Sequence, residues 1–153
     1  MDTETQEEFL LTEDEREAIV ETIISARFEE SNLFQKEEFH TLALTLQDQR
    51  ARDLVIWEMC RLKLDERNYV FKTLKLMTEN VTMVEAPHAW SAYAVALWID
   101  GQTPEADTIS RLILKSHPLH KMSFLIAISI QTNFTSETFI ETMNSMERDQ
   151  VSE

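Results

Sequence analysis

The sequence has very little glycine and proline, and this scarcity excludes most β architectures. Its 153 residues include one glycine, Gly101, and three prolines. Tight β-turns depend on residues that adopt a positive φ or that fix φ, so sheets built from hairpins are disfavoured. Nucleotide binding through a P-loop or a dinucleotide-binding loop is excluded as well, because each of these loops needs several glycines.

Cysteine, export signals and long apolar runs are also scarce. Cys60 is the only cysteine, so an internal disulfide cannot form. Residues 1–11 are acidic, whereas a signal peptide begins with basic residues and continues with an apolar stretch. The longest apolar stretches, around 92–99 and 124–130, fall short of the roughly 20 residues that span a bilayer. These features predict a soluble, cytoplasmic protein that does not enter a membrane.

Basic residues are outnumbered by acidic ones. The chain has 28 acidic and 14 basic residues, for a formal net charge of −14, which repels nucleic acid and anionic membranes. The charge is uneven, with −9 over residues 1–31 and +3 over residues 50–75. Acidic runs usually serve solubility as a solvated helix face, and a role of this run in partner binding stays open.

The sequence is rich in helical signals, beginning with a capping box near the N-terminus. In that box Thr12 and Glu15 can satisfy each other's backbone N–H groups, which predicts a helix from there to about Glu30. Residues 1–11 precede the box without periodicity and are expected to form a flexible acidic tail.

Helical spacing continues through the middle of the chain. Apolar residues at positions i, i+3, i+4 and i+7 predict a helix over 34–47; they are Phe39, Leu42, Ala43 and Leu46. Asp48 and Asp65 can each cap a further helix. The stretch 79–86 breaks the pattern before a proline and is expected to be a connector.

A helical hairpin is predicted after this connector. Pro87 suits the first turn of a helix that Gly101 can end, and Thr103 with Pro104 restarts a second helix. The second helix should stop at His117, before Pro118.

This hairpin resembles one tetratricopeptide repeat over residues 87–120. The matching residues are Trp90, Tyr93, Ala94, Leu97, Gly101, Ala106, Ile113 and Pro118. One repeat cannot bury its own faces, so neighbours should stack on it. Phe124, Ala127 and Ile128 keep the phase of Trp90, Tyr93 and Ala94, and a returning helix after Thr135 could follow them. The resemblance implies an all-α fold of about eight helices in antiparallel hairpins, a tetratricopeptide-like array that forms one domain over 12–149.

The segment 47–140 also resembles the C-terminal helical part of an uncharacterised actinobacterial family known only as a domain of unknown function. The similarity rests on residues 48–53, Trp90, residues 98–101, Ala106 and residues 114–118. This resemblance implies a fold and no function.

Residues that could support chemistry are few. His117 and His120 could face one another as metal ligands, but no nearby Cys, Asp or Glu completes a site, and a structural role is the stronger interpretation. Cys60 lies beside Arg61, a cation that can activate a thiol, yet a buried structural cysteine is more common. We therefore expect no catalytic residues, no metal and no cofactor.

The sequence predicts a non-enzymatic helical module that binds a peptide or a partner protein. The alternative is an acidic decoy that mimics nucleic acid and blocks a nucleic-acid-binding protein. In tetratricopeptide arrays the first helix of each hairpin lines the binding surface, so outward positions of the helices at 88–100 and 120–131 are the candidates for partner binding. They are Ser91, Val95, Trp98, Ser123 and Gln131. Trp98 is the strongest candidate among the aromatic residues, because it lies one position off the packing face.

Overall fold

The computed structural model describes residues 10–25 and 36–151, and over these residues the fold is all-α with no strand. The eight helices are α1 (Glu13–Ile24), α2 (Lys36–Thr45), α3 (Gln49–Cys60), α4 (Leu64–Thr78), α5 (Pro87–Ile99), α6 (Thr103–Ser116), α7 (Lys121–Gln131) and α8 (Ser136–Ser145). The predicted all-helical class is confirmed. In the described part of the chain, no helix is long and apolar enough to cross a membrane.

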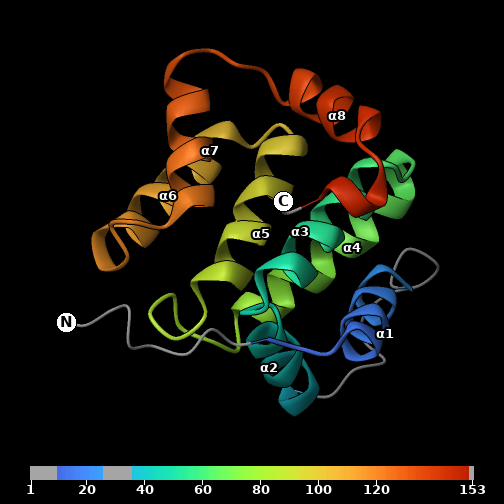
Figure 1. Cartoon of the computed structure of the whole chain (residues 1–153). Coiled ribbons are helices and arrows are strands. Elements are labelled where there is room, and N and C mark those ends of the chain that lie inside the picture. The colour runs from blue at the N-terminus through green and yellow to red at the C-terminus, as the bar shows by residue number, and fades with distance from the viewer. Residues whose placement is uncertain (1–9, 26–35, 152–153) are drawn as a thin grey trace.

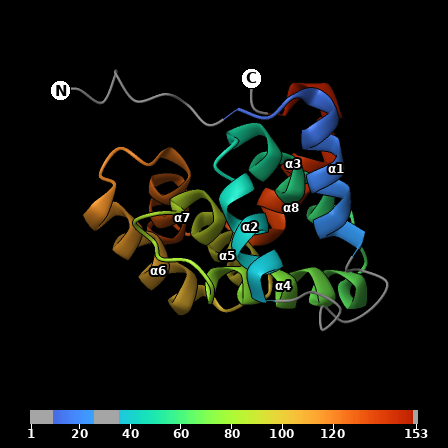
Figure 2. The same ribbon diagram turned by 90° about the horizontal axis from the view of Figure 1, so that it is seen from below.

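Helix α5 occupies the centre of the molecule (Figure 1). It packs against α3, α4, α6, α7 and α8. Helices α6 and α7 lie side by side at one end, and α1 lies at the opposite end, as the two views agree (Figure 2). The helix α8 turns away from α7 and packs against α3 and α5.

Several helices begin at side-chain caps that the sequence provides, whereas α4, α5 and α6 begin without one. Glu15 N–H donates to Thr12 Oγ1 at 3.1 Å and Thr12 N–H donates to Glu15 Oε1 at 2.9 Å, so the predicted capping box is present. Thr135 accepts from Thr138 N–H at the start of α8, as predicted. The helix α4 begins one residue before Asp65, which lies in the first turn and does not cap it. The predicted continuation of α1 from residue 26 to Glu30 lies outside the described residues.

Asp48 caps α3 and also joins it to α1. Its buried carboxylate accepts from Ala51 N–H at 2.8 Å, from Leu11 N–H at 2.8 Å and from Arg16 Nη2 at 2.9 Å. Burial by itself would raise the pKa of Asp48, but the hydrogen bonds from Arg16 and the two backbone N–H groups bring the pKa below its ordinary value. Asp48 is therefore a carboxylate at pH 7, and it holds the N-terminal part of α1 against the core.

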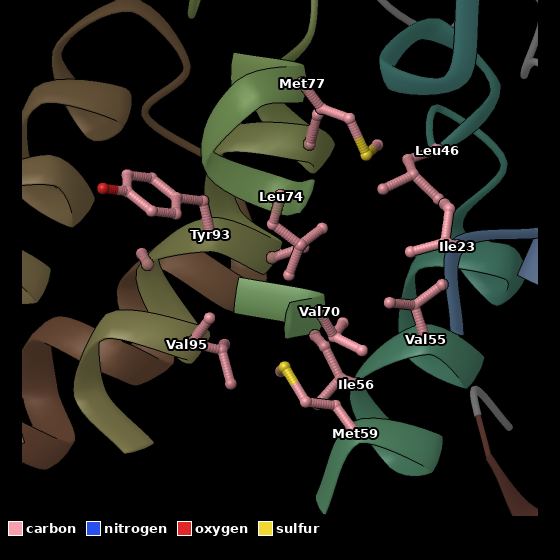
Figure 3. Close-up of a cluster of buried hydrophobic side chains, with 14 of the residues drawn as sticks. Ile23, Leu46, Val55, Ile56, Met59, Val70, Leu74, Met77, Tyr93 and Val95 are labelled. Atoms are coloured by element: carbon pink, nitrogen blue, oxygen red, sulfur yellow. The ribbon is translucent and has the colours of Figure 1, made fainter. Parts of the chain in front are cut away.

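The core lies between α3, α4 and α5, with α1 and α2 covering one side (Figure 3). Figure 3 labels side chains that are buried here, among them Ile56, Met59 and Leu74, which are at most 1% exposed. The C-terminal segment crosses α3 after α8. Trp57 Nε1 donates to Met146 O at 3.1 Å, and Val151 beyond it is 1% exposed. Residues from both ends of the chain thus pack on α3.

Candidate interaction surface

Four of the five residues predicted to bind a partner lie in the interior. Ser91, Val95 and Ser123 are 0% exposed and Trp98 is 4% exposed, so the expectation that these side chains face solvent is wrong. Gln131, at the end of α7, is exposed. For the three residues on α5 the error arises because this helix is packed against five others, whereas the resemblance implied a first helix with one open face.

Trp98 packs between aromatic side chains that follow α7 and belong to α8. Its ring centroid lies 5.3 Å from that of Phe139 and 6.5 Å from that of Phe134. Such offset aromatic pairs contribute to packing beyond the area that they bury. Trp98 therefore attaches α8 to α5 and does not form part of an open surface.

The phase predicted for α7 is also wrong in part. Ala127 is buried as expected, but Phe124 is 56% exposed and Ile128 is 36% exposed. The residues that α7 buries are Ser123, Ile126 and Ala127. The helix is thus rotated relative to the packing face that the resemblance implied.

The rotation leaves an apolar face on the outside of α7. Phe124, Leu125 and Ile128 are 56%, 54% and 36% exposed, and they are neighbours because residues three and four positions apart share a helix side. Lys121 and Gln131 extend the same side at its two ends, and both are exposed. Helix α7 packs mainly on α5 and α6, on its other side. We call Lys121, Phe124, Leu125, Ile128 and Gln131 the outer face of α7.

The sequence did hold a signal for this face. The residues of α7, KMSFLIAISIQ, are apolar around most of the helix. An edge helix ordinarily carries polar residues on the side away from the core. A helix that is apolar all round is either fully buried or contributes to an interface.

A pair of histidines joins α5 to the start of α7. His88 Nδ1 lies 2.8 Å from His120 Nε2. Ser123 N–H points at His120 Nδ1 at 3.3 Å, and since a backbone N–H can only donate, the ring proton of His120 is on Nε2. His120 therefore donates to His88 Nδ1, which also accepts from Arg52 Nη1 at 3.1 Å.

Both rings of this pair are neutral at pH 7. Burial, followed by repulsion from Arg52, lowers the pKa of His88 to about 3 and that of His120 to about 4. An adjacent guanidinium disfavours a second positive charge, and the neutral ring of His88 can accept the Arg52 hydrogen bond. Arg52 is itself paired with Asp53 at 2.6 Å.

The hydroxyl oxygen of Ser123, Oγ, lies 2.9 Å from His120 Nδ1. A serine nucleophile and its general base are found at such a distance. Ser123 is 0% exposed, however, and its own backbone N–H donates to the same nitrogen. His120 is the N-cap of α7. The arrangement therefore caps a helix and is closed to a substrate.

His117 and His120, which were considered as a metal pair and interpreted as structural residues, have other partners. A groove of about 650 Å³ opens beside His88, His117 and His120, where the loop before α3, the connector before α5 and the loop before α7 meet. His117 Nε2–H donates to Val84 O at 3.1 Å, while His120 is bonded to His88. Over residues 10–25 and 36–151, no group of three or more His, Cys, Asp or Glu side chains is placed to hold a metal ion.

Cys60 is buried at the end of α3. Burial raises the pKa of its thiol to about 12, and the nearby Arg67 offsets only part of this rise. Because the thiolate is the reactive form, this thiol is inert at pH 7. Cys60 is a core side chain.

Comparison with known proteins gives no relative. No protein-family model, curated protein or solved structure matches the chain.

Proposed function

We propose that the protein is a non-enzymatic interaction module that binds a helical segment of a partner protein on the outer face of α7. The observation that supports this proposal is the run of three large apolar side chains, Phe124, Leu125 and Ile128, exposed side by side. Single exposed apolar residues are ordinary on protein surfaces, whereas contiguous ones mark binding sites. An amphipathic helix that docks its apolar side on such a face is a common mode of recognition.

The proposal treats the fold as a tetratricopeptide-like array with one open end. In repeat proteins each unit is covered by the next, and the terminal units carry a polar outer side. Here α7 follows the α5–α6 hairpin, but the next helix, α8, packs on α3 and α5 and leaves the outer face of α7 uncovered. A helix from another protein would occupy the place that a further repeat takes in a longer array.

Two further observations support a binding role over an enzymatic one. The serine and histidine that lie within hydrogen-bond distance, Ser123 and His120, are buried and serve a helix cap. The thiol of Cys60 is buried with a raised pKa. We place this function in the cytoplasm, where a protein with a single unpaired cysteine remains reduced.

A pair of matched leucine substitutions tests the proposal. Leu125→Ser alters the outer face of α7, and Leu64→Ser alters a leucine on α4 that is 65% exposed. Partners are captured from the source organism with each variant and identified by mass spectrometry, and their affinities are then measured with purified proteins. We expect Leu125→Ser to weaken binding of the genuine partner by more than about 1 kcal/mol, as at interface hot spots, and Leu64→Ser to leave it unchanged. Equal affinities for both variants would show that the partner binds elsewhere.

The acidic decoy is a second candidate because α1 carries several exposed carboxylates. Glu13, Asp14 and Glu21 are exposed on this helix. Other acidic residues of α1 have structural partners, since Glu15 completes the capping box and Glu17 pairs with Arg148 at 2.6 Å. Reversing the charge of the three exposed residues to lysine should abolish binding by a decoy and leave binding at α7 intact.

A further inference from the structure

The outer face of α7 lies in the longest stretch of the chain without an acidic residue. Between Asp107 and Glu137 the sequence has three basic residues and no aspartate or glutamate. The charge of residues 108–136 is therefore +3, and that of the rest of the chain is −17. In a protein with 28 acidic residues, this segment is a local exception to the overall charge.

Two basic residues of this stretch lie on α7 and on the helix packed beside it. Lys121 lies one helical turn before Phe124 and Leu125, on the same side of α7. Lys115 is exposed on α6, the helix packed beside α7. Arg111, one turn before Lys115, pairs with Asp107 at 3.0 Å, which leaves Lys115 and Lys121 as the lysines of this stretch.

We infer that the partner segment is an acidic amphipathic helix, whose apolar side covers Phe124, Leu125 and Ile128 and whose carboxylates meet Lys115 and Lys121. This inference rests on the proposed function and adds the chemistry of the partner. Complementary charge around an apolar centre selects the partner and fixes its register. Glutamate residues on the flanks of the partner helix would supply that charge.

The same charges disfavour a second copy of the chain as the occupant. A twofold interface presents the same patch from both subunits. Two outer faces of α7 would therefore bring together two copies of the segment 108–136, which has no carboxylate, and each copy has a net charge of −14. Such a pairing buries apolar surface but lacks any opposite charge.

An anionic membrane fits less well than a helix. A membrane is an extended charged surface, and its field acts over about 10 Å in solutions of about 0.1 M salt. It would meet the acidic surface of the remaining chain, whose charge is −17, as well as the basic segment. A single helix would contact only the outer face of α7, with Lys121, and Lys115 on α6.

Two synthetic peptides provide the direct test. Both are helix-forming and carry leucines in the same one-sided pattern, and they differ only in having glutamate or lysine at the remaining positions. Their affinities for the full chain are measured by fluorescence anisotropy. We expect the acidic peptide to bind about tenfold more tightly than the basic one, a difference of about 1.4 kcal/mol, because the two lysines attract the acidic peptide and repel the basic one.

Charge-reversal variants locate the effect. The double variant Lys115→Glu/Lys121→Glu should lose this preference and bind the basic peptide more tightly. A matched double variant on α4, Lys72→Glu/Lys75→Glu, reverses two exposed lysines away from the site and should retain the preference of the original chain. Circular dichroism of each variant confirms that the helices are intact.

Several outcomes would overturn the inference. If the basic peptide bound as tightly as the acidic one, or more tightly, the inferred acidic partner would be wrong. If Leu125→Ser then abolished binding of the basic peptide, the proposed interaction face on α7 would still stand. Failure of the chain to bind either peptide would also overturn the inference, while the capture experiment with Leu125→Ser and Leu64→Ser judges the proposed function independently. Binding to phosphatidylserine vesicles in preference to the acidic peptide would assign the face to a membrane. A dimer in sedimentation that Leu125→Ser dissociates would assign it to a second copy.

Discussion

Helices α5 and α7 have similar compositions and opposite environments. Both are dominated by apolar residues, yet eleven of the thirteen residues of α5 are buried and only three of the eleven residues of α7 are. The difference lies in their neighbours, since five helices pack around α5, whereas α7 packs mainly on two helices. Composition thus shows that a helix can be buried, and the surrounding helices decide whether it is.

This contrast explains why three residues of α5 were wrongly predicted to face solvent. A first helix of a tetratricopeptide hairpin has one open side, and the same position in this chain is held by the central helix α5. Ser91, on the expected open side, donates its hydroxyl to His88 O within the helix and is 0% exposed. The open apolar side belongs to α7 instead.

The largest expected effect tests the burial of α5. Trp98→Ala removes a ring that is 4% exposed and that packs on Phe134 and Phe139. We expect the free energy of unfolding to fall by about 3–5 kcal/mol, the usual cost of truncating a buried tryptophan. Urea denaturation followed by circular dichroism measures the change. A loss below about 1 kcal/mol would mean that Trp98 is not core.

A smaller effect is expected where α5 and α6 approach each other. Ala106 is 0% exposed on α6, and it is one of the residues that match the tetratricopeptide repeat. Ala106→Trp should lower the free energy of unfolding by about 1–3 kcal/mol through overpacking. The control is Thr108→Trp, at an exposed position of the same helix. Equal stabilities of the two variants would contradict a close contact at Ala106.

The third prediction concerns the histidine link between α5 and α7. The pKa values of His88 and His120 are lowered to about 3 and about 4, below their ordinary value of 6.5. At a pH between the folded and the unfolded pKa values, the unfolded chain binds more protons than the folded one. The free energy of unfolding therefore falls as the pH drops from 6.5 toward the pKa values of the folded state. His88→Asn keeps an acceptor near the Nδ1 position and removes one titrating group.

We therefore expect His88→Asn to lose less stability on acidification than the original chain. The difference between about pH 7 and about pH 4 should be about 3 kcal/mol, from a pKa of 6.5 in the unfolded chain and about 3 in the folded one. Asp48 also loses its hydrogen-bonded carboxylate form in acid, but this loss is common to both proteins and cancels in the comparison. His40→Asn, on α2, serves as the control. If the free energy of unfolding depended on pH in the same way for the original chain and His88→Asn, the pKa of His88 would not be lowered by folding.

Much of the fold could be predicted from local signals. Caps at Thr12, Asp48 and Thr135 act within one helical turn, so the sequence near each of them is sufficient to place a helix start. The start of α4 was missed because Asp65 and Glu66 both suit a first turn, and only the backbone shows that Lys63 occupies the cap position.

The candidate site could not be predicted in the same way. The apolar surround of α7 is visible in the sequence, but it is equally typical of a fully buried helix. What decides the exposure of this face is that α8, the next helix in the chain, packs on α3 and α5 and does not cover it. The link between His88 and His120 is likewise set by tertiary packing, because these residues are 32 positions apart.

The smallest expected effect is on α7 itself and completes the comparison. Phe124→Ala removes a ring that is 56% exposed, so it gives up only part of the burial energy of a phenylalanine, and alanine has the better helix propensity. We expect the free energy of unfolding to change by less than about 1 kcal/mol. The matched variant Phe39→Ala, at a phenylalanine on α2 that is 5% exposed, should cost about 3–5 kcal/mol. If Phe124→Ala proved as costly as Phe39→Ala, Phe124 would be a core residue, and the outer face of α7 would not be available to a partner.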